Sequence, residues 1–224
     1  MHTNELLDPP EVDSPEVDSP EAMLAMGRAI FPLRFGNKGP GRLRNTGPVM
    51  RTTSDGVAGV ETRFAYSWIE AEQHAGATRE QVREWLTLVF QHSSSWVSAG
   101  VWFPRAENPG AAQVIITYVA GQITCGSVHG AAGCTRNFSN GPSRIRIDEN
   151  PLGRPPAQGI SRGLQKGILH ELAHAAFRAS HKGSPSIMSK TPQGLPSTPL
   201  RFPTFNDIQS VIAYTRGQNQ VGSS

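Results

Sequence analysis

Two histidines and a glutamate lie close together in the stretch HELAHAAFRASH, residues 170–181. His170 and His174 are four residues apart, a spacing that places both imidazoles on one face of a helix. Their ring nitrogens could then bind one ion, and zinc is the ion that this spacing typically binds. Glu171 lies about 100° further round the helix axis, where it would reach a water molecule rather than the ion. The motif H-E-x-x-H therefore predicts hydrolysis through a metal-activated water, with Glu171 as general base.

The alternative is a structural helix whose two histidines are half-buried and bonded to carbonyl groups of the core. The same helix already offers Ile168, Leu169, Leu172 and Phe177 to a core. Adding two imidazoles and a carboxylate to that surface costs desolvation free energy unless these groups have partners. The context therefore favours a zinc site.

A catalytic zinc ion needs a third protein ligand and one open position. Asp207 is the only acidic residue after Glu171, so His181 is the first downstream candidate. In a continuous helix His181 would lie about 10.5 Å beyond His174 along the axis and could not share the ion. The helix must therefore end between about residues 176 and 180, and the chain must double back. Otherwise His181 is a surface histidine, and the ion is held by two histidines and water, or recruits Asp207 or a residue from elsewhere in the chain.

The stretch HELAHAAFRASH, followed by SIM at residues 186–188, resembles the metzincin zinc metallopeptidases, and among them the matrixins most closely. Their motif is H-E-x-x-H-x-x-G-x-x-H, followed by a turn that carries a methionine. The resemblance implies that His170, His174 and His181 bind Zn²⁺, and that Met188 forms a hydrophobic floor beneath the metal.

The stretch departs from the family pattern at two positions. In a gap-free comparison the family's glycine, which lets the chain turn after the helix, falls on Phe177, and its third histidine falls on Ser180. The turn must therefore use one extra residue or a non-glycine residue in the left-handed conformation. We predict a turn one residue longer than the family's that delivers His181 to the site.

The periodicity of apolar residues predicts a mixed α/β (α+β) domain. The resemblance implies a metzincin-like catalytic domain: a twisted mixed sheet, an active-site helix, a methionine turn and a C-terminal helix. The expected elements are strands in ETRFAYSWIE (61–70), VWFPRA (101–106), AQVIITYVAG (112–121) and SRIRIDE (143–149), and helices from Thr78, from about Ser161, and over 203–217 with closure at Gly217. Thr78 and Gln81 have the spacing of a capping box. A glycine-rich loop with His129 is expected before residue 143.

Composition divides the chain into three parts. Residues 1–57 form a disordered or extended acidic segment and connector that could be a propeptide, residues 58–218 the metallopeptidase domain, and residues 219–224 a tail. Within the domain, Cys125 and Cys134 could form a disulfide or remain free thiols. The proline-rich stretch 189–204 is expected to carry specificity.

The chain has a net charge of +3, with a strongly acidic N-terminus and scattered arginines. This distribution argues against a nucleic-acid partner. A run of 18 apolar residues is lacking, so we expect no membrane partner. A protein or peptide substrate and a monomer are expected. No secretory signal is visible, and only the resemblance favours an extracellular location.

These features predict a zinc-dependent metalloendopeptidase. The alternative is a catalytically degenerate zinc-binding protein of the same fold, acting as a binding module or effector. The shifted third histidine and the missing glycine are what support the alternative.

Overall fold

A computed structural model of the chain describes residues 33, 43–121, 123–148, 162–182, 186–189 and 202–221. By its internal contacts the chain divides into two units, Met1–Phe31 and Pro32–Ser224, and the described residues all belong to the second. The acidic stretch 1–22 therefore lies outside the described residues, as does most of the stretch 189–204.

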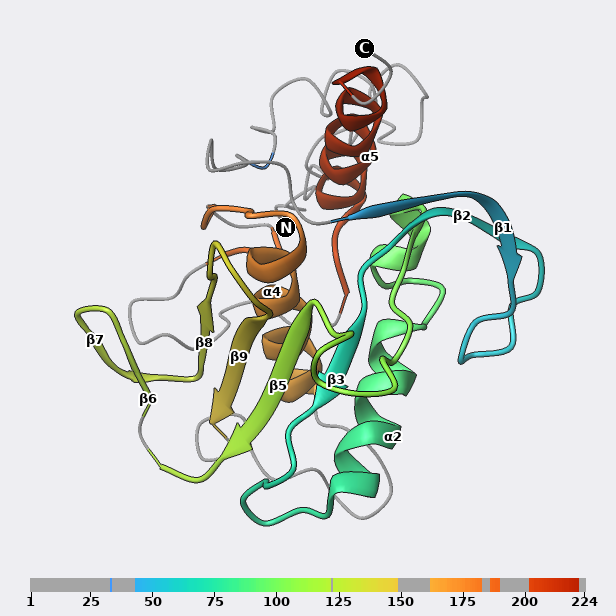
Figure 1. Ribbon diagram of the computed structural model, residues 1–224. Helices are drawn as coiled ribbons and strands as arrows, with labels where there is room; N and C mark the ends of the chain where they lie inside the picture. Colours follow the sequence, from blue (N-terminus) through green and yellow to red (C-terminus); the bar gives the residue numbers. More distant parts are fainter. Residues whose placement is uncertain are drawn as a thin grey trace, which may run out of the picture. The chain divides into compact units, whose positions relative to one another are not determined.

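The described residues form a mixed α/β fold in which the largest sheet has four strands (Figure 1). Their order across the sheet is β3 (Trp68–Glu70), β5 (Val114–Val119), β9 (Ser143–Asp148) and β8 (Gly133–Arg136). β3, β5 and β9 are parallel, whereas β8 runs antiparallel to β9 at one edge. The expected α+β class is confirmed, and β9 lies within the expected strand 143–149 with Ile145 and Ile147 buried in the core.

A second sheet lies on the N-terminal side of the fold. β1 (Arg44–Arg51) pairs antiparallel with β2 (Val60–Ala65), which pairs parallel with the short β4 (Val101–Trp102). β1 belongs to the stretch that was expected to connect the acidic segment to the domain. The part of that connector in β1 is thus extended, and it pairs with a strand of the domain.

The single strand expected over residues 61–70 is wrong, because two strands in different sheets occupy this stretch. β2 ends at Ala65 and β3 begins at Trp68. Between them, Ser67 donates its backbone N–H to the side chain of Gln113, just before β5, at 2.9 Å. Alternation suggested one buried face, but both faces are buried here, since Ala65 and Ile69 are as inaccessible as Tyr66 and Trp68. A strand covered on both faces carries no alternation to mark where it changes partner.

Two helices pack against the four-stranded sheet and against each other. α2 (Arg79–Phe90) begins with the predicted capping box of Thr78 and Gln81, and contacts β3. α4 (Arg162–Ala176) contacts β8 and β9, and α2 contacts α4. The main core fills the space between these elements, and its largest fully buried side chains include Trp68, Tyr66, Phe90, Trp96, Phe103 and Phe177.

The glycine-rich stretch before β9 is more regular than expected. β6 (Ile123–Cys125) and β7 (Val128–Ala131) form an antiparallel hairpin, so His129 lies on a strand rather than in a loop. The hairpin is followed by β8, and a disulfide joins Cys125 to Cys134. Of the two states that the sequence left open for these cysteines, the structure has the bonded one.

Loss of this disulfide is expected to destabilise the protein. Replacing both Cys125 and Cys134 by alanine should lower the free energy of unfolding by about 2–3 kcal/mol, because the unfolded chain regains the entropy of a short loop. Chemical denaturation of the double variant and the oxidised wild type measures the difference. The reduced wild type is the matched control and should resemble the variant, and equal stability in all three would contradict the prediction.

The C-terminal helix α5 (Phe205–Val221) runs past the predicted closure at Gly217. A glycine can stay helical where no tertiary contact favours the left-handed turn, so its presence alone did not end the helix. Val211 and Ile208 join the main core, and α5 contacts the short 3-10 helix η1 (Trp96–Ala99). None of the helices in the described part of the chain is long and apolar enough to cross a membrane.

A buried carboxylate joins β3 to α2. Glu70 is inaccessible and accepts hydrogen bonds from Arg79, Arg83 and Arg105. Burial opposes ionisation of Glu70, but the hydrogen bond and charge of Arg105, with the charge of Arg83, outweigh it and lower its pKa.

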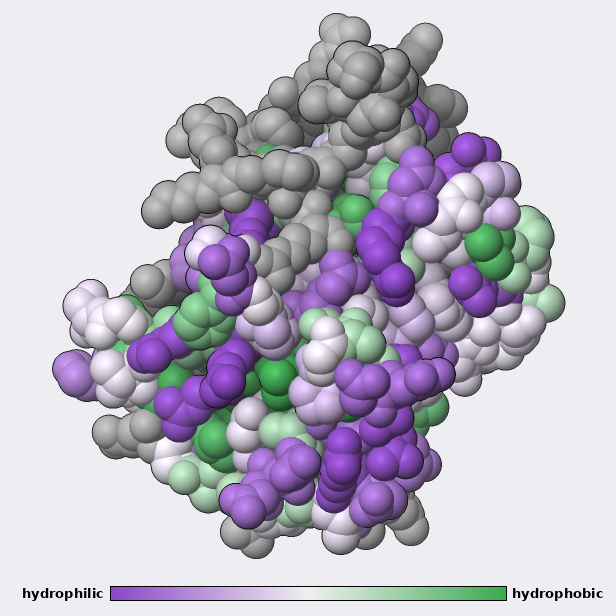
Figure 2. All heavy atoms as spheres, viewed as in Figure 1, coloured by the Kyte–Doolittle hydropathy of each residue, from purple (hydrophilic) through white to green (hydrophobic). Residues whose placement is uncertain are grey.

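On the face shown in Figure 2, hydrophilic residues gather over the lower right of the molecule, and apolar residues are interspersed among them.

Candidate metal centre

α4 carries the H-E-x-x-H motif, and its burial follows the predicted apolar pattern. Leu169 and Leu172 are fully buried against the sheet, while His170 and His174 are half-buried on another face. Glu171 points between α4 and β8 and is almost inaccessible. Packing of the apolar residues therefore fixes the rotation of the helix, and this rotation determines where the three polar side chains point.

The helix ends where the sequence required it to end, and a non-glycine residue makes the turn. Phe177 is fully buried and packs edge-on against Trp96, with ring centroids 5.2 Å apart. Arg178 then adopts the left-handed conformation with φ of 56°. The backbone carbonyl of Ala173 accepts the N–H groups of Phe177 at 3.0 Å and of Ala179 at 3.3 Å, which closes the helix.

The left-handed residue, Arg178, comes one position after Phe177. It is Phe177 that aligns with the glycine of the metzincin motif. His181 follows Arg178 by three residues, the same separation as in G-x-x-H. Contrary to the prediction, the turn is therefore not longer than in the motif; it begins one residue later and uses a non-glycine residue in the left-handed conformation, and His181 is displaced with it. The physical reason is the packing of Phe177, which keeps one more residue against the core before the chain can turn.

Replacing Arg178 by glycine is expected to stabilise the protein. A left-handed conformation costs a non-glycine residue about 1–2 kcal/mol, and the extra freedom of glycine in the unfolded chain offsets part of this gain. We expect the free energy of unfolding to rise by about 0.5–1 kcal/mol in chemical denaturation. Arg216→Gly on α5, where the backbone is helical, is the control and should lower it by about 1 kcal/mol. A loss of stability in Arg178→Gly would contradict the prediction.

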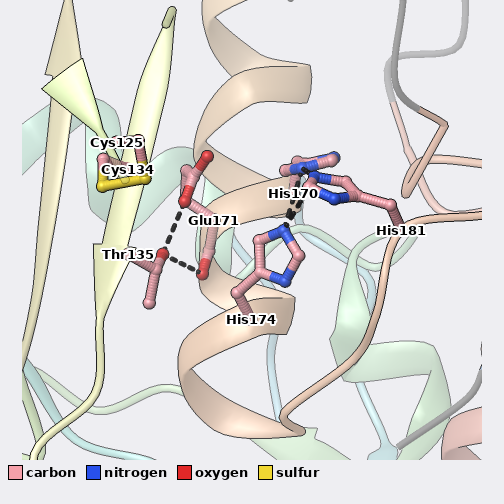
Figure 3. Close-up of a disulfide and its surroundings, with 7 residues drawn as sticks. All are labelled: Cys125, Cys134, Thr135, His170, Glu171, His174 and His181. Atoms are coloured by element: carbon pink, nitrogen blue, oxygen red, sulfur yellow. Dashed lines mark hydrogen bonds between the residues drawn. A yellow bond between two sulfur atoms is a disulfide. The ribbon is translucent and has the colours of Figure 1, made fainter. Parts of the chain in front are cut away.

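The turn brings the third histidine to the first two (Figure 3). The Nε2 atom of His170 lies 3.1 Å from that of His174 and 3.2 Å from that of His181, and the latter two are 3.3 Å apart. Tetrahedral ligation with metal–nitrogen bonds of about 2.0–2.1 Å separates two ligand nitrogens by about 3.3–3.4 Å. The three nitrogens therefore already form the triangular face that one tetrahedral ion requires.

The other ring nitrogens show which protonation states bring these Nε2 atoms together. Nδ1 of His170 lies 2.9 Å from the carbonyl of Ile187, and Nδ1 of His174 lies 2.6 Å from the carbonyl of Ala179. A carbonyl can only accept a hydrogen bond, so Nδ1 carries the proton in both rings. In a neutral ring Nε2 then offers a lone pair, so His170 and His174 each turn a lone pair toward Nε2 of His181. This donor set fits a cation.

The electrostatics of the pair favour the neutral rings that a metal needs. Burial lowers the pKa of His170 to about 3, and the neighbouring His174 adds to the effect. Burial likewise lowers the pKa of His174 to about 4, together with the charge of His181. Both imidazoles are therefore neutral at pH 7, with the proton on Nδ1, and no proton has to leave Nε2 when they bind an ion.

The turn that carries Met188 is hydrogen-bonded to the segment that carries His181. Met188 is fully buried, and its carbonyl accepts the N–H of Lys182, next to His181, at 3.0 Å. Asp207, at the start of α5, holds this turn by accepting hydrogen bonds from the Ser186 hydroxyl at 2.6 Å and the Ile187 N–H at 2.9 Å. Asp207 is thus a structural anchor in the first turn of α5, and its carboxylate is bonded to the methionine turn rather than to the histidines.

Glu171 is held on the other side of α4 by β8 (Figure 3). The hydroxyl of Thr135 donates to Glu171 Oε2 at 2.6 Å and lies 3.0 Å from the Glu171 carbonyl. Burial raises the pKa of Glu171 to about 7, and the Thr135 hydrogen bond opposes the rise. A carboxylate with a pKa near neutrality is suited to accept a proton and return it.

Sequence reasoning found the three histidines, Glu171 and Met188, but it missed the groups that orient them. These groups are the backbone carbonyls of Ile187 and Ala179 and the side chain of Thr135. Carbonyls have no signature in a sequence, and Thr135 lies 36 residues before Glu171. The one available signal was the alternation of inward and outward side chains in a strand over residues 133–136. The glycine and the cysteine in this stretch obscured that alternation.

Comparison with known proteins adds little to this geometry. No family model matches the chain, and no curated protein matches it. Among the solved structures, a chain of the GM1 bound form of the ECX AB5 holotoxin is similar at 18% sequence identity with a TM-score of 0.40. The match covers 78% of this chain and 86% of that chain. At this level the likeness carries no argument about function.

Proposed function

We propose that this protein is a zinc-dependent metalloendopeptidase of the metzincin type. The observation that carries the proposal is the meeting of the Nε2 atoms of His170, His174 and His181 at 3.1–3.3 Å, with the Nδ1 atoms of the first two bonded to carbonyls. Three imidazole nitrogens at these separations, two of them in neutral rings, are hard to explain without a cation between them.

The metzincin assignment is supported by the order of elements around the site. A mixed sheet with an antiparallel edge strand, a helix with H-E-x-x-H, a left-handed turn, a third histidine, a buried methionine turn and a closing helix follow one another along the chain. In this proposal Met188 is the hydrophobic floor of the site and Asp207 fixes its position.

Each residue of the site has a definite role in the proposed reaction. His170, His174 and His181 would hold the zinc ion, which when bound polarises the scissile carbonyl and acidifies a water molecule. Glu171 accepts the proton of the attacking water and then delivers it to the leaving amine. Burial raises the pKa of Glu171 to about 7, which suits a group that accepts a proton and returns it.

The strand β8 is the proposed binding edge for the substrate. It is the outer strand of the four-stranded sheet and contacts α4. An extended peptide could add to this edge through main-chain hydrogen bonds, which would bring a peptide bond past the histidines. The partner expected from this surface is an unfolded or extended segment of protein.

The proposal is tested by metal content and peptide cleavage of the full chain. Elemental analysis should find one zinc ion per chain after incubation with the ion and removal of the excess. A library of quenched fluorescent peptides should then reveal cleavage that a chelator abolishes and added zinc restores. Zinc binding without cleavage would favour the degenerate binding protein, and a chain that binds no zinc would overturn both functions.

A further inference from the structure

The carboxylate of Glu171 is in contact with two residues of β8 that point to the same side of the sheet. Gly133 pairs with Ile147, and Thr135 pairs with Ile145, both of which face the main core and α4. The residue between them, Cys134, faces the opposite side, where the disulfide joins it to Cys125. The alternation of β8 therefore presents Gly133 and Thr135 to the helix.

Gly133 is required here because of a close approach. A Cβ atom at this position would lie 2.7 Å from both Cγ and Oε1 of Glu171. Thr135 holds the other carboxylate oxygen, because its hydroxyl lies 2.6 Å from Oε2. One oxygen is thus confined by the missing side chain of Gly133, and the second is confined by a hydrogen bond.

We infer that Thr135, together with Gly133, is a positioning residue that fixes the orientation of the Glu171 carboxylate for proton transfer. The inference rests on the proposed function, which makes Glu171 the base. The Thr135 hydroxyl is bonded to Glu171 and not to the histidines, so it acts on the site through Glu171. A buried carboxylate free to rotate would present its lone pairs to the water in only part of its conformations, and small misplacements of a base are costly.

The kinetic test uses Thr135→Val, which keeps the shape of the side chain and removes the hydroxyl. In the zinc-loaded protein we expect kcat to fall by about 10- to 100-fold while KM and zinc content stay within about twofold of wild type. Thr135→Ser, which restores the hydroxyl, should recover kcat to within about threefold. Thr117→Val is the matched control, because Thr117 pairs with Arg146 and faces away from α4. It should leave kcat unchanged.

Gly133→Ala provides a second, independent variant. The added methyl group displaces a flexible side chain rather than the backbone, so the protein should fold while the carboxylate moves. We expect a loss in kcat of about tenfold or more with unchanged zinc content.

A measurement that does not depend on activity tests the hydrogen bond itself. In the metal-free protein Thr135→Val should lower Tm by about 5 °C, because a buried carboxylate loses its donor. In a Glu171→Met background the same substitution should lower Tm by less than about 2 °C, since the partner is already absent.

The outcomes separate this inference from the proposed function. Peptide cleavage with wild-type kcat in Thr135→Val, and an equal Tm loss in both backgrounds, would overturn the inference and leave the peptidase intact. A wild-type protein that binds zinc and cleaves no peptide would overturn the proposed function and the positioning role with it. The Tm coupling would then report only on the bond between Thr135 and Glu171.

Discussion

Replacing Glu171 by glutamine is expected to reduce kcat for peptide cleavage by about 10²–10⁴-fold, the range in which a positioned general base contributes. Glutamine has nearly the same shape and can still accept the hydrogen bond of Thr135, but it cannot take a proton from water. Because Glu171 points toward β8 rather than toward the three Nε2 atoms, the variant should still bind one zinc ion per chain. Peptide-cleavage assays measure kcat, and elemental analysis of the same preparation measures the zinc content.

Glu84→Gln is the matched control for this experiment, because Glu84 is exposed on α2 and does not contact the site. Its kcat should equal that of wild type. Burial raises the pKa of Glu171 to about 7, so the unprotonated base is lost as pH falls through that value, and the wild-type rate should fall with it. A bound zinc ion would move this acid limb to lower pH. A Glu171→Gln variant that keeps a tenth or more of the wild-type kcat would show that another group is the base.

Replacing His181 by alanine is expected to weaken zinc binding by more than about 100-fold, since even groups that only orient a metal ligand are worth 10- to 100-fold. The geometric reason is that its Nε2 lies 3.2–3.3 Å from those of His170 and His174, at the third corner of the site. Competition with a chromogenic chelator measures the dissociation constant. Zinc should also raise the Tm of wild type, and this rise should disappear in the variant at equal zinc concentration.

His129→Ala is the control for His181→Ala, because His129 is also an exposed histidine but lies on β7. It should bind zinc like wild type. Equal zinc affinity in His181→Ala and wild type would make His181 a bystander, and the third ligand would have to come from elsewhere in the chain. Asp207 is a poor substitute, because its carboxylate is already bonded to Ser186 and Ile187.

The elements with regular apolar spacing could be predicted from the sequence alone. α2 with its capping box, β9 with Ile145 and Ile147 facing inward, and α4 lie where the pattern placed them. Periodicity depends on which face of an element is buried, and for these elements one face dominates. The β2–β3 segment failed for the opposite reason, because both of its faces are covered.

The spacing within α4 determined by itself that His170 and His174 share a face and that Glu171 lies beside them, since helix geometry is local. The sequence also required a turn before His181, because a continuous helix would carry it out of reach. Only the tertiary structure decided how that turn is made: the burial of Phe177 against Trp96 delays it by one residue, and Arg178 takes the left-handed conformation. The tertiary structure likewise decided which carbonyls orient the imidazoles and which strand holds Glu171. These contacts join residues far apart in the chain, and the pairing of distant segments depends on the packing of the whole core rather than on local pattern.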